Sequence, residues 1–399
     1  MKLEKKKVLL LASVASMIDQ FNMGNIRILL DMGYEVHVAC NFAKGNTCDQ
    51  GRIRKFKKEL EKMQVVYHQW DCPRSIYAAG RCVKAFVQLW ELTGRHQFLW
   101  IHCQSPVGGV LARIIAHKRQ TGVMYTAHGF HFYQGASLKN WLLYYPVEKL
   151  LSYWTDVLVT VNKEDYLFAK RKLKAKKVCR TPGAGIEVQK FCRVAKSKNR
   201  QAFCRSCQIP QNAVILLSVG ELSRRKNHRE VLLALASLPH REIYYVICGQ
   251  GKLERSLRAQ AQKLGIASQI RFAGFQEDTA QFYQNADIFV LPSRQEGLSV
   301  ALMEAMAAAK ACLVSDIRGN RELIDRAGGR RFAPGKPHML AKELELLLDD
   351  PRRMTAYGRY NRQKIQNYDK HVVDVRMKKI YAWMTMRYEK QPAEQNMPV

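Results

Sequence analysis

The chain has 399 residues, of which 47% are hydrophobic and 25% are charged, with 65 Lys and Arg against 34 Asp and Glu. This composition excludes a disordered chain, a collagen and a small disulfide scaffold, and the length predicts two or three domains. The net charge of +31 favours polyanionic partners, which are nucleic acid, an anionic membrane surface or phosphorylated substrates.

The N-terminal segment MKLEKKKVLLLASVAS resembles a secretory signal peptide, because basic residues precede a short apolar run. A buried first β-strand has the same composition. The amphipathic segment Gln20–Met32 and a second apolar run, Tyr34–Cys40, continue a βαβ pattern, so we prefer the strand. No stretch has the roughly 18 apolar residues of a spanning helix. The 11 cysteines lie mostly in apolar runs, as reduced cytosolic thiols do, so we expect a cytoplasmic protein.

Short apolar runs alternate with amphipathic segments along the whole chain, which indicates parallel sheets with helices on both faces. We therefore predict an α/β fold with two doubly wound, Rossmann-like domains that face a cleft. The strands predicted in the first half are Lys7–Ser13, Glu35–Asn41, Gln64–Gln69, Phe98–His102, Val123–Ala127, Thr155–Val161 and Lys177–Arg180. Those predicted in the second half are Val214–Gly220, Tyr244–Gly249, Ile270–Gly274, Asp287–Pro292 and Ala311–Asp316.

A stretch that is rich in Lys and Arg and poor in apolar periodicity separates the two halves. We expect an N-terminal domain at residues 1–185, a basic inter-domain connection at 186–210 and a C-terminal domain at 211–365. A C-terminal helix with a tail, at 366–399, is expected to pack back toward the N-terminal domain. Ligands of such sheets bind outside the carboxyl ends of the strands.

The most informative segment is Phe289–Met306, which has the pattern of a buried strand, a turn and a helix. Gly297 in the turn allows close approach of the backbone. The N–H groups of Leu298 and Ser299, at the predicted helix start, suit a phosphate or sugar oxygen.

Glu296 and Glu304 bracket this predicted anion site, and alone they would be ordinary surface acids. Their spacing matches the E-x7-E motif of retaining glycosyltransferases with the GT-B fold. The chain resembles family 4 of these enzymes, the glycosyl transferases group 1, which builds bacterial capsule and exopolysaccharide. Besides the opening strand and the E-x7-E segment, the resemblance rests on Tyr125–Tyr133, Ser218–Leu222, Lys226–His228 and Arg318–Leu323.

The resemblance implies retaining transfer of a sugar from a nucleotide-sugar donor, with a UDP-sugar preferred, to a lipid-linked saccharide acceptor. It places the acceptor side in the N-terminal domain and the nucleotide sugar in the C-terminal domain. Glu304 would bind the ribose and Glu296 would face the donor sugar. No His or Asp cluster has metal-ligand spacing, so we expect no metal ion and no cofactor.

Lys226 follows Gly220 at the spacing of the family and would neutralise the leaving diphosphate. The family often has an Arg directly after this glycine, where the present chain has Glu221. Arg224 or Arg225 would then replace it, and we assign Arg225 to the nucleotide sugar.

His128 ends a predicted strand, where the family has a histidine that reaches the donor sugar; a structural histidine is the alternative. Gly274 and Phe275 resemble the place where the base meets the backbone. The loop Ser16–Asn25 has one glycine, Gly24, where related enzymes often have a pair.

The basic helix at Arg52–Lys62 and the aromatic-rich segment Phe130–Trp154 suit an anionic lipid surface, although both also fit core packing. We therefore expect peripheral attachment to the inner face of the plasma membrane. One alternative function is a GT-B sugar-nucleotide epimerase. Another is a nucleic-acid-binding protein, which charge alone supports and for which the sequence has no known motif, so we expect no nucleic-acid partner.

Overall fold

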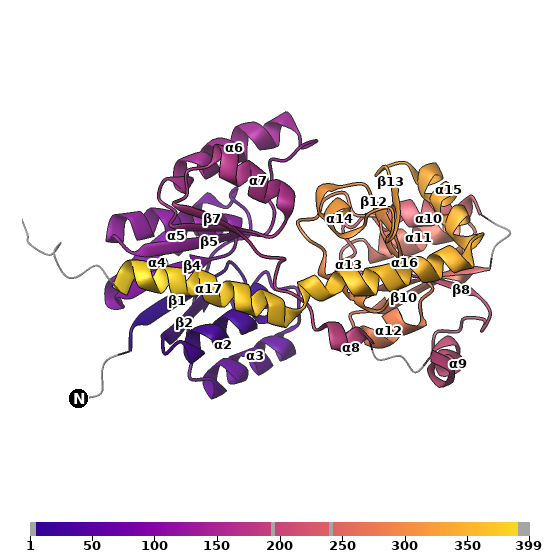
Figure 1. Ribbon diagram of the computed structural model, residues 1–399, viewed down its shortest axis with the longest axis horizontal. Coiled ribbons are helices and arrows are strands. Elements are labelled where there is room, and N and C mark those ends of the chain that lie inside the picture. Colours follow the sequence, from indigo (N-terminus) through magenta and orange to yellow (C-terminus); the bar gives the residue numbers. More distant parts are fainter. Residues whose placement is uncertain (1–4, 193–195, 239–241, 390–399) are drawn as a thin grey trace, which may run out of the picture. The chain divides into compact units, whose positions relative to one another are not determined.

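The computed structural model describes residues 5–192, 196–238 and 242–389. Contacts divide the chain into two compact units (Figure 1). Unit 1 runs to Ala184 and resumes at His371, whereas unit 2 is the continuous segment Gly185–Lys370. Each unit contains one parallel β-sheet with helices packed on both faces.

The sheet of unit 1 has seven strands in the order β3-β2-β1-β4-β5-β6-β7. They are β1 (Lys7–Leu11), β2 (Glu35–Cys40), β3 (Val66–Gln69), β4 (Phe98–Cys103), β5 (Gly122–Ala127), β6 (Val157–Thr160) and β7 (Lys177–Arg180). Strand β1 pairs with β2 and β4, and Val8–Leu11 are fully buried. The N-terminal apolar run is therefore a core strand, as predicted.

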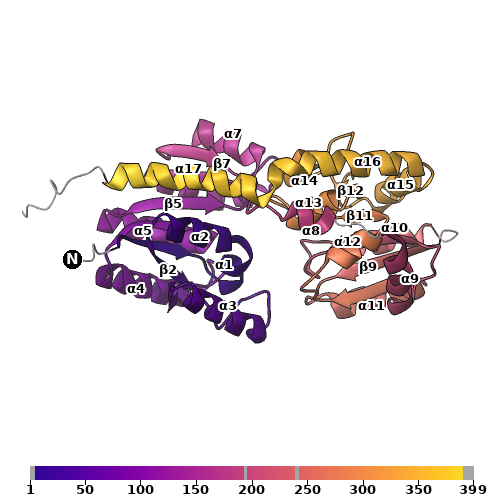
Figure 2. The ribbon, with the colours of Figure 1, turned by 60° about the horizontal axis from the view of Figure 1, so that its bottom comes forward.

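Helices cover both faces of this sheet (Figures 1 and 2). One face carries α1 (Ala15–Phe21), α2 (Met23–Asp31), α3 (Gln50–Lys62) and α17 (Lys370–Glu389). The other carries α4 (Ala79–Arg95), α5 (Pro106–Arg119), α6 (Leu138–Ser152) and α7 (Lys163–Lys172). Helix α17 buries Val373, Met377, Ile380, Tyr381 and Met384, which form one apolar stripe, in the core of unit 1. The predicted tail from residue 390 lies outside the described residues.

The sheet of unit 2 has six strands in the order β10-β9-β8-β11-β12-β13. They are β8 (Val214–Val219), β9 (Ile243–Cys248), β10 (Ile270–Gly274), β11 (Ile288–Leu291), β12 (Ala311–Ser315) and β13 (Gly329–Phe332). The last strand was not predicted, because its sequence Gly-Arg-Arg-Phe contains one apolar residue. Its arginines, Arg330 and Arg331, form ion pairs with Glu343 and Asp316.

Two helical layers enclose this second sheet. The first contains α8 (Val188–Cys192), α9 (Lys196–Ser206), α12 (Ala280–Asn285), α13 (Val300–Ala307) and the 3-10 turn Ile365–Tyr368. The second contains α10 (Arg229–Ala236), α11 (Glu254–Lys263), α15 (Pro337–Leu348) and part of α16 (Pro351–Lys364). The remaining elements are α14 (Arg318–Leu323) and the 3-10 turn Ala267–Gln269.

The segment 186–210 differs from the predicted inter-domain connection, because its described residues belong to unit 2. Ile186, Phe191, Phe203 and Ile209 are buried in the same core cluster as β8 and α13. These apolar residues lie on two short helices within a basic stretch and have no regular spacing. Their packing against the core of unit 2 could therefore not be predicted from the sequence. Residues 193–195 of this segment lie outside the described part.

No helix in the described ranges is both long enough and apolar enough to cross a membrane.

Candidate active site

The carboxyl ends of β8 and β11 form the switch point of the second sheet, since strand order runs outward from this pair in both directions. Crevices at such points are the usual ligand sites of open α/β sheets. The loop after β8 carries Gly220–Asn227, the loop after β11 carries Pro292–Ser299, and α14 begins beside them at Arg318. These three segments contain most of the predicted site residues.

Glu296 is a buried carboxylate that two cations hold. Its Oε1 lies 2.8 Å from Nζ of Lys226, and its Oε2 lies 3.0 Å from a guanidinium nitrogen of Arg225. Burial acts to raise the pKa of Glu296, but the charges of Lys226 and Arg225 outweigh it and lower the pKa below its usual value. Glu296 is therefore ionised at neutral pH and fixed in position.

The loop after β8 brings Lys226 and Arg225 to this carboxylate. Gly220 has a φ of +154°, and a Cβ there would lie 3.0 Å from Cε of Lys226. Asn227 donates a hydrogen bond from Nδ2 to the carbonyl of Pro292 at 3.3 Å, which ties the two loops together. Arg224 and Arg225 are both exposed, and the structure places the guanidinium of Arg225 at Glu296.

Two glycines, Gly249 and Gly274, lie at the carboxyl ends of β9 and β10, the strands that follow β8 in the order of the sheet. Gly249 follows β9 with a φ of +150°, and a Cβ there would overlap the carbonyl oxygen of Gly220 at 1.9 Å. Its N–H donates to the carbonyl of Gly274 at 2.7 Å. Beside Gly274 the space that a Cβ would occupy is open, since no atom lies within 4 Å of it, and the side chain of the next residue, Phe275, is 47% exposed. Sequence reasoning found Gly274 and missed Gly249, whose role depends on strand neighbours.

Glu304 lies on α13, the helix that follows the Glu296 turn. The side chain of Ser299 caps this helix by accepting a hydrogen bond from the N–H of Leu302 at 3.4 Å. The hydroxyl of Tyr283 donates to Oε2 of Glu304 at 2.9 Å. Burial raises the pKa of Glu304 to about 7, and the Tyr283 hydrogen bond acts in the opposite direction. The two glutamates of the motif thus have opposite pKa shifts.

The turn at Gly297 and Leu298 packs against the start of α14. A Cβ on Gly319 would lie 2.5 Å from the carbonyl oxygen of Gly297, so only glycine allows this approach without movement. Nε of Arg318 donates to the carbonyl of Glu296 at 3.4 Å. Sequence reasoning missed Gly319 as a support of the site, although it noted the surrounding motif.

His128 belongs to unit 1, where it follows β5. Its Nε2 donates to Oε1 of Gln104 at 2.9 Å, which leaves Nδ1 as an acceptor. Burial lowers the pKa of His128 to about 4, so the ring is neutral at physiological pH. Gln104 also bonds to Asn22, in the helical segment after β1, where related enzymes often have a glycine pair.

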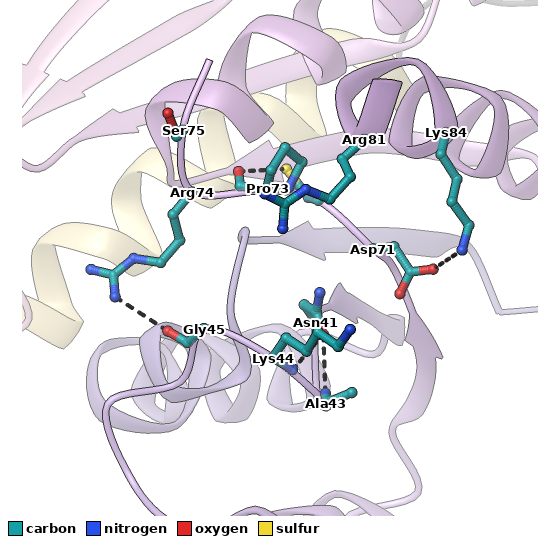
Figure 3. A pocket seen from close by; sticks show the side chains of 11 residues that line it. Asn41, Ala43, Lys44, Gly45, Asp71, Pro73, Arg74, Ser75, Arg81 and Lys84 are labelled. Atoms are coloured by element: carbon teal, nitrogen blue, oxygen red, sulfur yellow. Dashed lines mark hydrogen bonds and ion pairs between the residues drawn. The ribbon is translucent and has the colours of Figure 1, made fainter. Parts of the chain in front are cut away.

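A hollow of about 370 Å³ lies in unit 1 beside the carboxyl ends of β2 and β3 (Figure 3). The charged side chains that line it are Lys44, Arg74, Arg81, Lys84 and Asp71. Lys84 pairs with Asp71 at 2.6 Å, so cations outnumber carboxylates in the lining. The hollow can therefore hold an anionic group. Sequence reasoning missed it, because its residues come from two separate loops and the start of α4.

Comparison with known proteins identifies the family. Residues 199–364 match the family described as Glycosyl transferases group 1, and residues 7–162 match the one described as Glycosyl transferase 4-like. The glycosyltransferase EpsD of Bacillus subtilis is 33% identical over 391 residues, which cover 96% of this chain and 98% of EpsD. The chain belongs to the group 1 glycosyltransferases. The resemblance drawn from the E-x7-E segment is therefore confirmed at the level of the family.

This group 1 glycosyltransferase has other relatives at lower identity. An N-acetylgalactosaminyltransferase of Campylobacter jejuni, named for diacetylbacillosaminyl-diphospho-undecaprenol, is 28% identical over 58% of this chain and 62% of its own length. Solved structures share the fold. Anabaena HepE, in complex with UDP and glucose, has a TM-score of 0.75 at 17% identity and covers 95% of this chain and all of its own. The lipopolysaccharide glycosyltransferase WaaG has a TM-score of 0.70 at 18% identity, over 94% of this chain and 99% of its own. The predicted GT-B fold of two Rossmann-like domains is confirmed.

Proposed function

We propose that this group 1 glycosyltransferase transfers a sugar, with retention of configuration, from a UDP-sugar to a lipid-linked saccharide of a bacterial surface polysaccharide. The observation that carries the proposal is the ionised Glu296 carboxylate, paired with Lys226 and Arg225 at the switch point of a Rossmann-like sheet. Two relatives are named for diphosphoundecaprenol-linked acceptors, and HepE was solved with UDP. These names support the choice of acceptor and of nucleotide.

The donor would occupy the carboxyl edge of the second sheet. Glu304 would accept hydrogen bonds from the ribose hydroxyls, and the N–H groups of Leu298 and Ser299 would donate to the diphosphate. The uncovered backbone beside Gly274 leaves room for a flat base, and the exposed ring of Phe275 offers it a stacking surface.

In the proposed reaction the bond between the anomeric carbon and the β-phosphate oxygen breaks. The acceptor oxygen forms its bond to that carbon on the same face, and its proton passes to the leaving phosphate oxygen. Negative charge grows on the diphosphate in this step, so the ammonium of Lys226 and the guanidinium of Arg225 stabilise the transition state. Glu296 keeps both cations in place and accepts hydrogen bonds from the donor sugar.

His128 would bind the donor sugar as a neutral imidazole, because burial keeps its pKa at about 4. With Nε2 donating to Gln104, its Nδ1 remains free to accept a hydrogen bond from a sugar hydroxyl. The role we propose for His128 is therefore to position the sugar and not to transfer a proton.

The basic hollow of unit 1 suits the anionic part of a lipid-linked acceptor. Lys44 and Arg81 both line it (Figure 3). A diphosphate carries several negative charges, and guanidinium groups bind phosphate oxygens in a bidentate manner. We therefore assign the acceptor diphosphate to this hollow.

We expect transfer to continue in excess EDTA, because fixed cations and N–H donors stabilise the leaving diphosphate without a divalent ion. The assay is transfer from a UDP-sugar to an undecaprenyl-diphosphate-linked saccharide, with NMR of the new linkage to check retention. Complete loss of activity that magnesium or manganese restores would contradict the proposed donor site. Inversion at the anomeric carbon would contradict the retaining mechanism alone.

We also propose peripheral attachment to an anionic membrane through α6. The apolar stripe of the basic helix α3 is core, since Ile53, Phe56 and Leu60 are buried, so that helix contributes charge only. Much of the aromatic segment is core too: Phe132 and Trp141 pack on each other. The outer surface of α6 instead presents leucines.

Leu138 is 80% exposed and Leu142 is 78% exposed, one helical turn apart, with Lys139 beside them. Aliphatic side chains flanked by cations are typical of a helix that lies in a membrane interface. This pair therefore carries the apolar part of the proposed attachment.

We expect the double variant Leu138→Ser and Leu142→Ser to lose most of the salt-resistant binding to anionic vesicles. Salt screens exposed charges beyond about 8 Å at physiological ionic strength, so only inserted apolar groups resist it. Vesicle sedimentation at low and high salt measures the electrostatic and the apolar contributions to binding separately. The control is Leu346→Ser on unit 2, where the side chain is 42% exposed. Equally weak binding of the unchanged protein to anionic and neutral vesicles would refute the attachment.

A further inference from the structure

Three histidines of unit 1 converge although they are far apart in the sequence. His37 lies on β2, His68 lies on the neighbouring strand β3, and His96 directly follows α4. One ring nitrogen of each lies within 4.8 Å of the others, and Nδ1 of His37 is 2.9 Å from Nε2 of His68. Their spacing matches no local ligand motif, which is why sequence reasoning missed the cluster.

We propose that His37, His68 and His96 form a binding site for a divalent transition-metal ion, with zinc as the first candidate. Imidazole nitrogen is the commonest protein ligand of such ions, and three imidazoles with one water complete a tetrahedral zinc site. The cluster belongs to unit 1, whereas the candidate donor site belongs to unit 2. The proposed ion is structural: it links the edge strand β3 to β2 and to the end of α4.

Glu35 holds the ring of His37 in the tautomer that has its proton on Nε2 and leaves Nδ1 able to bind a metal ion. Its Oε1 lies 2.8 Å from Nε2 of His37, so Nε2 donates and the lone pair of Nδ1 points toward His68. Metal-bound histidines usually donate their second nitrogen to a carboxylate in this way, which sets the tautomer. In the metal-free protein the Nε2–H of His68 points at this lone pair, so an ion bound to Nε2 requires the proton to move to Nδ1 of the same ring.

The charges around the cluster are compatible with neutral ligands. A neutral imidazole has one ring nitrogen with an available lone pair, and the hydrogen bond to Glu35 leaves that lone pair on Nδ1 of His37. Lys7 on β1 adds a positive charge nearby, and the carboxylate of Glu35, its register partner, offsets that charge.

The geometry requires small movements of two side chains. Zinc–nitrogen bonds of about 2.1 Å with tetrahedral angles place ligand nitrogens roughly 3.4 Å apart. The 2.9 Å contact must open slightly, and the longest separation must close. His68 and His96 are half-buried, which leaves a path for the ion, and His96 lies at a helix end outside the sheet.

Cobalt(II) binding tests the site, because tetrahedral cobalt has strong visible absorption bands. Tag-free protein stripped by a chelator is expected to bind one ion per chain. Replacement of either half-buried ligand, His68→Gln or His96→Gln, should abolish these bands, and Glu35→Gln should lower the metal affinity about 10–100-fold. Zinc should raise the Tm of the unchanged protein and leave that of the two histidine variants unchanged.

Two control variants each remove a side chain outside the cluster that could bind a metal ion. His338→Gln removes an exposed histidine of unit 2, and Cys207→Ser removes a partly buried free thiol of unit 2, so both should bind cobalt like the unchanged protein. Cooperative unfolding of each metal-free variant near the Tm of the unchanged protein verifies its fold. Absence of cobalt binding, or binding that survives His68→Gln and His96→Gln, overturns the proposal. These measurements do not use transfer activity, so they stand apart from the proposed function.

Discussion

Lys226→Met is expected to lower kcat about 10²–10³-fold, the loss typical of removing one preorganised group that stabilises developing charge. Lys226 is 9% exposed and 2.8 Å from Glu296, so neither water nor another side chain readily replaces its ammonium. Steady-state transfer from a UDP-sugar measures the loss. Arg224→Met, an exposed cation two residues earlier, is the matched control and should keep kcat within about twofold, as for most surface substitutions.

The same variant should change the pH dependence of the remaining activity. Burial raises the pKa of Glu296, and Lys226 is the first of the charges that outweigh it. Without that ammonium the pKa rises, so the acid limb of the pH–rate profile should move to higher pH. The double variant Lys226→Met and Glu296→Gln removes the buried carboxylate that has lost one of its two cations, and should recover stability without activity. Wild-type kcat in Lys226→Met would refute the assigned role.

Glu304→Gln is expected to weaken UDP binding about 10–100-fold, as for loss of hydrogen bonds to a charged acceptor. Isothermal titration across pH 5–9 measures the effect. Because the pKa of Glu304 is about 7, the affinity of the unchanged protein should fall as pH decreases below 7, and the variant should lack this step. Titration of the nucleotide affects the unchanged protein and the variant equally. Subtracting one pH–affinity curve from the other therefore isolates the titration of Glu304. Unchanged affinity in Glu304→Gln would remove the central support for the donor site.

The stability of the ligand-free variant should change in the opposite direction. The folded-state pKa of Glu304 is raised above that of the unfolded chain, so its stabilising proton is present at low pH and lost as pH rises through about 7. Glu304→Gln should therefore have a Tm equal to that of the unchanged protein near pH 4 and a higher Tm above pH 7. Cys204→Ala, a buried core change, is the control and should leave UDP affinity unaltered.

The strands could be predicted because each is a short, buried apolar run. Lys7–Leu11 and Ile288–Leu291 are examples, and their carboxyl ends indicated where ligands would bind. Strand β13 could not be predicted, since its arginines are held by ion pairs with residues from other elements. Buried Phe191 and Phe203 were likewise hidden in a basic stretch, because charge dominates a local window.

Part of the candidate site was readable from the sequence because the E-x7-E segment is local. Glu296, Glu304 and the intervening turn lie within nine residues, so strand, turn and helix can be assigned together. The pairing of Glu296 with Arg225, and the approach of Gly249 to Gly220, depend on strand order. Such contacts are properties of the sheet, and no window of the sequence contains them.

The return of α17 to unit 1 has a consequence for synthesis of the chain. Tyr381 hydrogen bonds to buried His102, 279 positions earlier, and Thr385 bonds to Tyr34 across 351 positions. Unit 2 is one continuous segment of the chain, so its core can fold before the ribosome has finished synthesis. Unit 1 begins before unit 2 and is completed after it, because α17, one of the four helices on one face of its sheet, is made only after unit 2. Nascent unit 1 therefore exposes the apolar part of its sheet that α17 covers until that helix is made, the period in which a chaperone would be of most use.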